Sequence, residues 1–152
     1  MKKQLRSFGY AFEGIFTAIK TEAHLRFHIV AAFYVFIFAY LGEFTLPQWA
    51  ILALTTGLVI FAELVNTALE ELCDLYSTER NPKIKRIKDI SAGAVLVLAA
   101  AACIVALSLF LFSGKLCLAF CKLCAAPMWF IPLGLSCMLS VFFVAFTGKK
   151  KK

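Results

Sequence analysis

Long apolar runs dominate this chain, and short polar segments separate them. Runs of this kind cross the ~30 Å hydrocarbon core of a bilayer as helices. They cover about residues 28–41, 48–72, 90–112 and 123–147. Because the first run is short, we expect its helix to include residues 25–27, with Arg26 and His28 reaching toward the lipid head groups. The pattern predicts an all-α membrane protein with three membrane-spanning helices and a fourth near the C-terminus.

The run at residues 123–147 contains prolines near its start. Pro127 and Pro132 can kink a helix there or shorten its helical part. We expect this run to cross the membrane, and a re-entrant or surface hairpin is the alternative that the sequence leaves open.

An amphipathic segment precedes the first apolar run. Residues 4–23 place apolar side chains on an arc of about 100° and polar side chains opposite them. Such a helix lies in the membrane interface with its apolar face toward the acyl chains. The apolar residues are Leu5, Phe8, Phe12, Ile15, Phe16 and Ile19.

Composition and charge support a membrane protein and predict its orientation. Of the 152 residues, 62% are apolar, whereas soluble domains rarely exceed about half. The formal charge is +7, and most basic residues lie in short flanks beside the apolar runs, at residues 2–26, 80–88 and 149–152. This is the positive-inside pattern and not a nucleic-acid footprint. We therefore expect these flanks to be cytoplasmic and the turn at residues 42–47 to lie outside.

Three of the six cysteines are closely spaced. Cys117, Cys121 and Cys124 form a C-x3-C-x2-C pattern, which matches an iron–sulfur spacing of radical enzymes. The chain has no room for the barrel that such enzymes need, and the same spacing describes one face of a helix. The role of these cysteines and any disulfide connectivity stay open at this point.

The second apolar run ends in a polar stripe. At 100° per residue, Glu63, Asn66, Glu70 and Asp74 fall within about 80° of one helix face. Ionisable groups at membrane depth are costly unless they are paired, bound to a metal or open to water. The stripe therefore predicts a functional site near the cytoplasmic leaflet.

Further polar groups are expected at the same depth. Lys88 and Asp89 begin the third run, and Glu22 ends the amphipathic segment. Several carboxylates close together require a cation, and oxygen ligands favour Mg²⁺, which usually brings phosphate with it. A lysine can neutralise phosphate oxygens, and a spare carboxylate can accept a proton from a hydroxyl group. These are the components of phosphoryl transfer.

Other functions fit parts of this pattern. The chain lacks both the Gly-x4-Gly-Lys-Ser/Thr loop and the protein-kinase signature, so neither of those kinase classes applies. A small ion or proton transporter also uses membrane carboxylates, but its groups are expected to spread through the membrane depth. A structural subunit would leave the acidic stripe unexplained. Asp89 can also serve as the N-cap of the third helix, and Tyr10 as an interfacial aromatic.

The polar groups resemble the signature of a known family. The segment ELVNTALE at residues 63–70, Asp74, and the segment IKDISAGAVL at residues 87–96 are similar to the bacterial integral-membrane diacylglycerol kinase and undecaprenol kinase family. Residues 8–14 and 21–28 fit the same pattern in register. The resemblance covers about residues 3–112.

The resemblance implies a homotrimeric, ATP- and Mg²⁺-dependent lipid kinase of the bacterial inner membrane. It implies active sites at the cytoplasmic face that are shared between neighbouring chains. Residues 1–114 would form the kinase domain, and residues 115–152 an appended segment. The RFH sequence at residues 26–28 is more similar to undecaprenol kinases than to the diacylglycerol enzyme, which stays the alternative.

The resemblance also implies residue roles. Glu63 would be the general base on the lipid hydroxyl, and Glu22 and Glu70 would hold Mg²⁺ on the ATP phosphates. Asn66 and Lys88 would contact the phosphates, Asp74 would support the site, and Ala92 would lie beside the lipid. The remaining nucleotide-pocket residues would be Tyr10, Glu79, Arg80, Asn81 and Asp89.

This chain departs from the family pattern in three places. Residues 79–81 read ERN where the family commonly has Glu-Tyr-His, and Lys3 replaces an arginine, which loses a bidentate contact. The segment beyond Phe112 has no counterpart in the minimal family member.

Overall fold

The chain folds into a helical bundle, and the computed structural model describes residues 2–76 and 81–146. These residues contain no strand, so the predicted all-α class is confirmed. A π-helical segment, Leu107–Phe112, continues α4. The helices are α1 (Lys2–Thr21), α2 (Ala23–Leu41), α3 (Leu46–Tyr76), α4 (Pro82–Ala106), α5 (Lys115–Ala125) and α6 (Phe130–Phe146).

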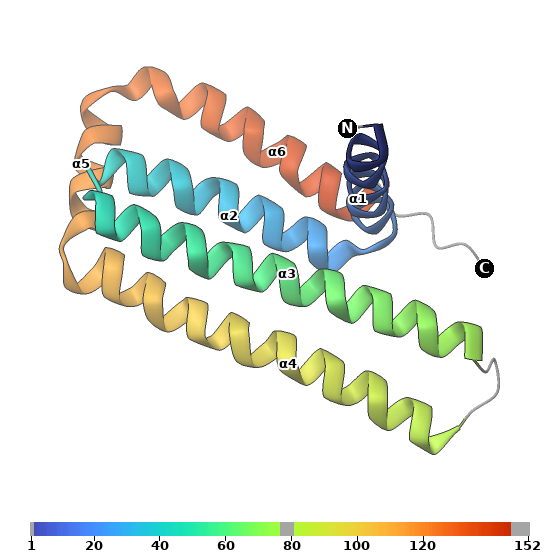
Figure 1. Cartoon of the computed structure of the whole chain (residues 1–152). Coiled ribbons are helices and arrows are strands. Elements are labelled where there is room, and N and C mark those ends of the chain that lie inside the picture. Colours follow the sequence, from blue (N-terminus) through green and yellow to red (C-terminus); the bar gives the residue numbers. More distant parts are fainter. Residues whose placement is uncertain (1, 77–80, 147–152) are drawn as a thin grey trace.

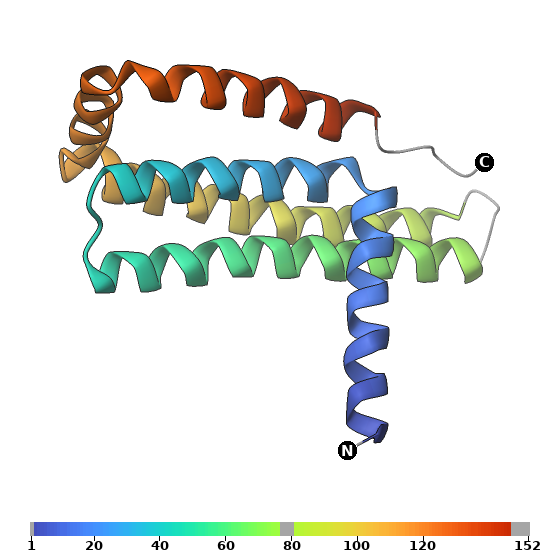
Figure 2. The same ribbon diagram turned by 90° about the horizontal axis from the view of Figure 1, so that it is seen from above.

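Four helical stretches of the described residues are long and apolar enough to cross a membrane. They comprise α2, α3, α4 with its π-helical extension, and α6 with the short turn before it, and they run side by side (Figure 1). Seen from above, α1 projects steeply away from the bundle (Figure 2). The aromatic side chains Phe8, Phe12 and Phe16 are exposed on this projection. An exposed apolar face on such a helix fits a position in the membrane interface.

Asn81 and Pro82 begin α4 earlier than hydropathy indicated. The Asn81 side chain accepts a hydrogen bond from the Lys83 backbone amide at 2.9 Å, and Pro82 occupies the first turn. Proline is well suited to this position because its missing amide hydrogen is not needed there. The prediction that Asp89 caps this helix is therefore wrong, and the charged residues 82–88 belong to the helix.

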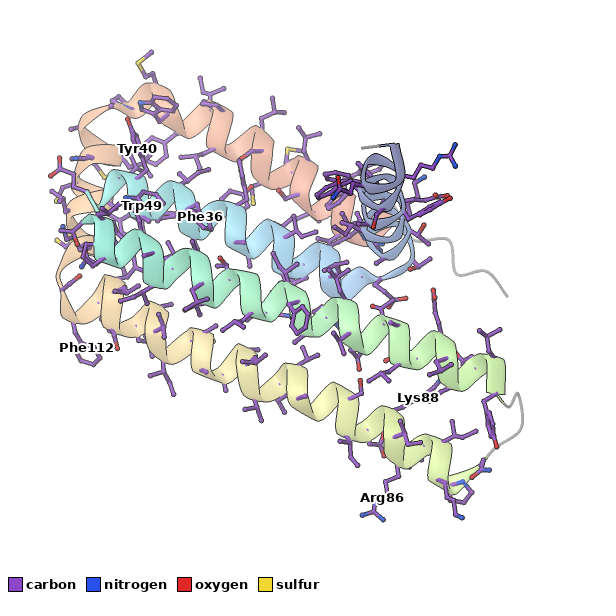
Figure 3. All side chains as sticks on the ribbon, in the orientation of Figure 1. Phe36, Tyr40, Trp49, Arg86, Lys88 and Phe112 are labelled. Carbon is purple, nitrogen blue, oxygen red and sulfur yellow. The ribbon has the colours of Figure 1, made fainter. Side chains whose placement is uncertain are left out.

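An apolar core closes one end of the bundle. The turn after α2 brings Phe44 against Phe110, with ring centroids 4.7 Å apart. Beside it, Trp49 stacks on Phe36 at 5.7 Å, and Figure 3 shows both on this end of the bundle. Gln48 caps the start of α3 by accepting a hydrogen bond from the Thr45 amide at 2.9 Å. The buried members of the cluster are Ala39, Phe44, Leu52 and Phe110.

The C-terminal segment forms two helices and not one run. α5 lies across the end of the bundle, a short 3-10 turn at Pro127–Trp129 follows, and α6 returns along α2 (Figure 1). Tyr34 of α2 shares hydrogen bonds with Ser136 and Ser140 of α6, each at 3.1 Å. The prolines therefore shorten the helical part and start a new helix, while α6 stays long enough to span.

Arg26 does not reach toward head groups as the sequence indicated. Its side chain is only 2% exposed, and its guanidinium donates to backbone carbonyls of α1 and α6. The expected position assumed free space beside α2, which the ends of α1 and α6 fill instead.

Candidate functional site

Glu63 is a buried carboxylate on α3 with a histidine partner on α2. Only 5% of the residue is exposed, and its Oε1 lies 3.1 Å from Nε2 of His28. One turn later, Thr67 is also buried and donates to the Glu63 carbonyl at 2.9 Å. A buried carboxylate requires such a polar partner, because burial without one is strongly unfavourable.

Asn66 and Glu70 form a hydrogen-bonded chain with α4. Asn66 Nδ2 donates to Glu70 Oε1 at 3.0 Å, and Ser91 Oγ donates to Asn66 Oδ1 at 2.5 Å. Ser91 is a buried residue of α4, so its hydroxyl fixes the amide orientation from the neighbouring helix. Among the described residues, no hydrogen bond or ion pair uses the remaining Glu70 oxygen.

Asp74 and Lys88 form an ion pair near the end of the α3–α4 hairpin at which the two helices are connected. Lys88 Nζ lies 2.5 Å from Asp74 Oδ1. In Figure 3 the Lys88 side chain lies between α4 and α3, whereas Arg86 points away from the bundle. The pair therefore holds an ammonium group beside the Asn66–Glu70 pair.

The predicted stripe thus divides between two neighbouring helices. Glu63 faces α2 through His28, while Asn66 and Asp74 face α4 through Ser91 and Lys88. The four residues share one side of α3, as predicted, but no hydrogen bond joins Glu63 to the other three among the described residues.

The other predicted site residues are less closely connected. Among the described residues, Tyr10, Glu22 and Asp89 make no hydrogen bond or ion pair between side chains with the rest of the site. Glu22 links α1 to α2 in an extended conformation, and its side chain makes no capping hydrogen bond. Asn81 caps α4, Ala92 is exposed on the same helix, and Glu79 and Arg80 lie outside the described residues.

The donor set can be tested for a metal. Within residues 2–76 and 81–146, no group of three or more His, Cys, Asp or Glu side chains could hold an ion by itself. Mg²⁺ typically takes one or two protein carboxylates and completes its shell with phosphate oxygens and water. Glu70 and Glu22 supply two carboxylates, which fits that lower requirement.

An apolar cavity of about 300 Å³ lies between α2, α3 and α4. His28, the partner of Glu63, lines it, and Leu52 and Val105 line it too. Since these residues lie at different depths of the bundle, the cavity leads from the Glu63–His28 pair into the membrane-spanning region. Its lining suits a hydrocarbon chain.

Sequence reasoning missed two residues that contact the site. His28 was expected to reach toward the lipid head groups, and Ser91 was not among the predicted site residues. Each could have been found by searching the neighbouring helices for a polar residue at the same membrane depth as the acidic stripe.

Known proteins with similar sequences define the class. The family described as prokaryotic diacylglycerol kinase matches residues 9–110. An undecaprenol kinase of Bacillus subtilis is 38% identical over 111 residues, which are 73% of this chain and 90% of that protein. A diacylglycerol kinase of Synechocystis is 41% identical over 102 residues, 66% of this chain and 58% of that protein. One of Helicobacter pylori is 30% identical over 97 residues, 63% of this chain and 75% of that protein.

No solved structure matches this chain. The sequence matches and the four apolar helices define a multi-pass membrane lipid kinase, an enzyme that transfers a phosphoryl group from ATP. The chain belongs to the prokaryotic diacylglycerol kinase family.

Proposed function

We propose that this protein phosphorylates undecaprenol, with Glu63 as the general base. The observation that carries the proposal is a buried carboxylate, paired with His28, at one end of an apolar cavity. The match to the Bacillus undecaprenol kinase, over 90% of that protein, supports this substrate. Diacylglycerol is the second candidate, because other similar proteins are diacylglycerol kinases.

In the proposed reaction the lipid hydroxyl oxygen attacks the γ-phosphorus of ATP. The bond between that phosphorus and the β–γ bridging oxygen breaks, and ADP leaves. Glu63 accepts the hydroxyl proton, and His28 orients the carboxylate through its Nε2 contact at 3.1 Å. The site beside Glu63 supplies orientation and charge neutralisation, which are most of what phosphoryl transfer requires.

Glu70 and Glu22 would hold Mg²⁺, which neutralises charge on the phosphates when bound. In support, Asn66 binds one Glu70 oxygen, and the other makes no hydrogen bond or ion pair within the described part of the chain. The Glu22 carboxylate is not used to cap α2 although it occupies the capping position.

The nucleotide would lie at the end of the α3–α4 hairpin at which the two helices are connected. Asn66 and Lys88 would contact its phosphates, and Asp74 would hold the lysine in place through their ion pair. The other residues of this pocket would be Tyr10, Glu79, Arg80, Asn81 and Asp89. The lipid would lie with its hydroxyl at Glu63 and its chain beside Ala92 and in the apolar cavity.

The larger arrangement is proposed as well. Residues 1–114 would form the kinase domain, and residues 115–152 an appended segment, since the family match ends at residue 110. Three chains would assemble and share sites; exposed apolar side chains on α3 and α4, such as Phe61 and Leu96, suit such contacts or lipid. The protein would lie in the bacterial inner membrane with its site at the cytoplasmic face.

The test is incubation of the purified full chain with labelled ATP, Mg²⁺ and a panel of lipid alcohols. The panel contains undecaprenol, a shorter polyprenol and diacylglycerol. We expect labelled undecaprenyl phosphate as the main product. Preferred labelling of diacylglycerol would replace the proposed substrate, and no lipid product with any alcohol would reject the proposed reaction.

A further inference from the structure

Arg26 connects three helices from a buried position on α2. Its Nη1 donates to the carbonyls of Ile19 at 2.9 Å and Lys20 at 3.1 Å, in the last turn of α1. Its Nη2 donates to the carbonyl of Val144 at 3.2 Å, in the last turn of α6. Among the described residues its Nε has no hydrogen-bond partner, and no carboxylate pairs with the guanidinium.

The charge of this guanidinium is balanced by helix ends. Each helix C-terminus carries roughly half a negative charge on carbonyls that have no partner within the helix. Two such ends, those of α1 and α6, converge on Arg26. Together they supply about one negative charge, which explains how a buried arginine is stable although no carboxylate of the described residues pairs with it.

The position of Arg26 along α2 relates this contact to the kinase site. Glu22 lies one turn before it, and the Arg26 amide donates to the Glu22 carbonyl at 3.3 Å. His28, the partner of Glu63, follows two residues later. Glu22 is also the whole link between α1 and α2, so the direction of α1 determines where the Glu22 carboxylate lies.

α6 lies outside the part of the chain that matches the family, which ends at residue 110. It is attached to α2 at two levels. Tyr34 bonds Ser136 and Ser140 in its middle, and Arg26 bonds Val144 near its end. The appended helix therefore contributes directly to the environment of Arg26.

We infer that Arg26 is a positioning residue of the kinase site and that α6 completes its binding partners. By fixing the ends of α1 and α6 together, Arg26 holds Glu22 in the direction required for the metal–phosphate complex. This inference rests on the proposed role of Glu22 as a Mg²⁺ ligand. It assigns the appended helix a function in the reaction.

The experiment compares Arg26→Lys with the unmodified full chain in the same detergent. Lysine keeps the charge but lacks the planar fork that reaches two helix ends at once. Two quantities are measured: amide hydrogen exchange of residues 18–22, and the Mg²⁺ concentration that gives half-maximal lipid phosphorylation. We expect exchange to rise by about tenfold. We expect the half-maximal Mg²⁺ concentration to rise by about tenfold as well, since small displacements of a ligand are costly.

A milder variant keeps the inference testable if Arg26→Lys folds poorly. Tyr34→Phe removes the hydroxyl that binds Ser136 and Ser140, and we expect smaller changes in the same two measurements. Tyr40→Phe is the matched control, because Tyr40 lies on the same helix with 76% exposure. We expect it to change neither measurement.

The outcomes separate this inference from the proposed function. Unchanged exchange in Arg26→Lys, or raised exchange with unchanged Mg²⁺ dependence, would overturn the positioning role. An unmodified protein that phosphorylates no lipid would reject the proposed function. In that case the exchange measurement still decides whether Arg26 fixes α1.

Discussion

Glu63 and His28 form a buried contact on which the proposed reaction depends. The carboxylate lies in an apolar part of α3, and the imidazole on α2 is the polar group within 3.1 Å of it. A carboxylate close to an apolar cavity can accept a proton from a hydroxyl group that lies within hydrogen-bond distance of it. This geometry supports the proposed role of Glu63 as a proton acceptor.

Glu63→Gln tests that role directly. The amide keeps the shape and can still bond His28, but it cannot accept a proton. We expect lipid phosphorylation to fall by about 100-fold to 10,000-fold, with ATP binding largely unchanged. The measurements are turnover with labelled ATP and nucleotide affinity by equilibrium binding. Glu71→Gln, at an exposed acid of the same helix, is the control and should retain activity. Normal turnover in Glu63→Gln would remove Glu63 as the base.

Ser91→Ala tests the hydrogen-bonded chain between α3 and α4. Without the hydroxyl, Asn66 loses the donor that orients its amide, and the amide can rotate away from Glu70. We expect ATP affinity to fall by about tenfold, the effect of one lost charge-supporting hydrogen bond. Ser108→Ala is the control, because within residues 2–76 and 81–146 the Ser108 hydroxyl bonds only the Ile104 carbonyl, one turn earlier. Equal nucleotide affinity in both variants would exclude this role for Ser91.

At the residue scale the sequence located the acids but not their partners. Polar and ionisable groups are rare in apolar runs, and this made the stripe recognisable. Its members are Glu63, Asn66, Glu70 and Asp74. His28 and Ser91 come from other helices, and their contacts depend on the rotation and depth of each helix in the bundle. Arg26 was misplaced for the same reason, since its partners belong to α1 and α6.

At the scale of elements, α5 is attached to the turn between α2 and α3. Lys122 bonds the Glu43 carboxylate, and Lys115 donates to the Glu43 carbonyl at 2.7 Å. Glu43 has a φ of 53°, a conformation unusual for residues other than glycine. These lysines therefore help to hold a backbone turn that the residue type does not favour.

The Glu43–Lys122 pair predicts a dependence of stability on pH. The hydrogen bond from Lys122 and the charge of Lys122 lower the pKa of Glu43 below its ordinary 4.5. Because the pKa of Glu43 is lower in the folded state, the ionised carboxylate stabilises the protein at pH values above its ordinary pKa. This stabilisation is lost as the pH falls through the lowered pKa. We expect Glu43→Gln to lower Tm at pH 7 and to have no effect at the acidic end.

The measurement is thermal unfolding in detergent between pH 7 and pH 3. Lys122→Met provides the matched background, because Glu43→Gln should change Tm less there at neutral pH. A Tm difference that is the same at every pH would show that the ionised pair does not support the fold.

Hydropathy predicted the middle of each span and missed several ends. The first span, α2, begins at Ala23, close to expectation, but α4 begins at Pro82 and not near residue 90. Its first turns are charged, so an apolar window cannot detect them, whereas the Asn81 cap and Pro82 could have indicated the start. The last apolar run is divided between α5 and α6 at Pro127. The sequence indicated that this proline can shorten a helix, but not that a new helix begins after it.

At the scale of the molecule, four spans with cytoplasmic basic flanks predict that the cysteines of α5 face the outside of the cell. α5 connects the third span to the fourth and carries Cys117, Cys121 and Cys124, all exposed and free. We expect an impermeant maleimide to label them in intact cells. A cysteine introduced at Lys85, in a background without native cysteines, should react only after the membrane is opened. Labelling at position 85 in intact cells, without labelling of the α5 cysteines, would show that the protein has the opposite orientation.

The fold class of the whole molecule was predictable from the sequence, but the arrangement of its helices was predictable only in part. Composition and four apolar runs gave an all-α membrane protein, and the family signature gave the kinase class. The steep direction of α1 and the packing of α6 against α2 were not predictable, because both depend on contacts between distant residues such as Tyr34 and Ser140.

The presence of α6 has a consequence for the two ends of the polypeptide. An even number of crossings returns the chain to the leaflet from which it started, whereas an odd number does not. Reporter proteins joined to the two ends of this chain would therefore lie in the same compartment. A relative that stops after the equivalent of α4 would present its ends to opposite compartments.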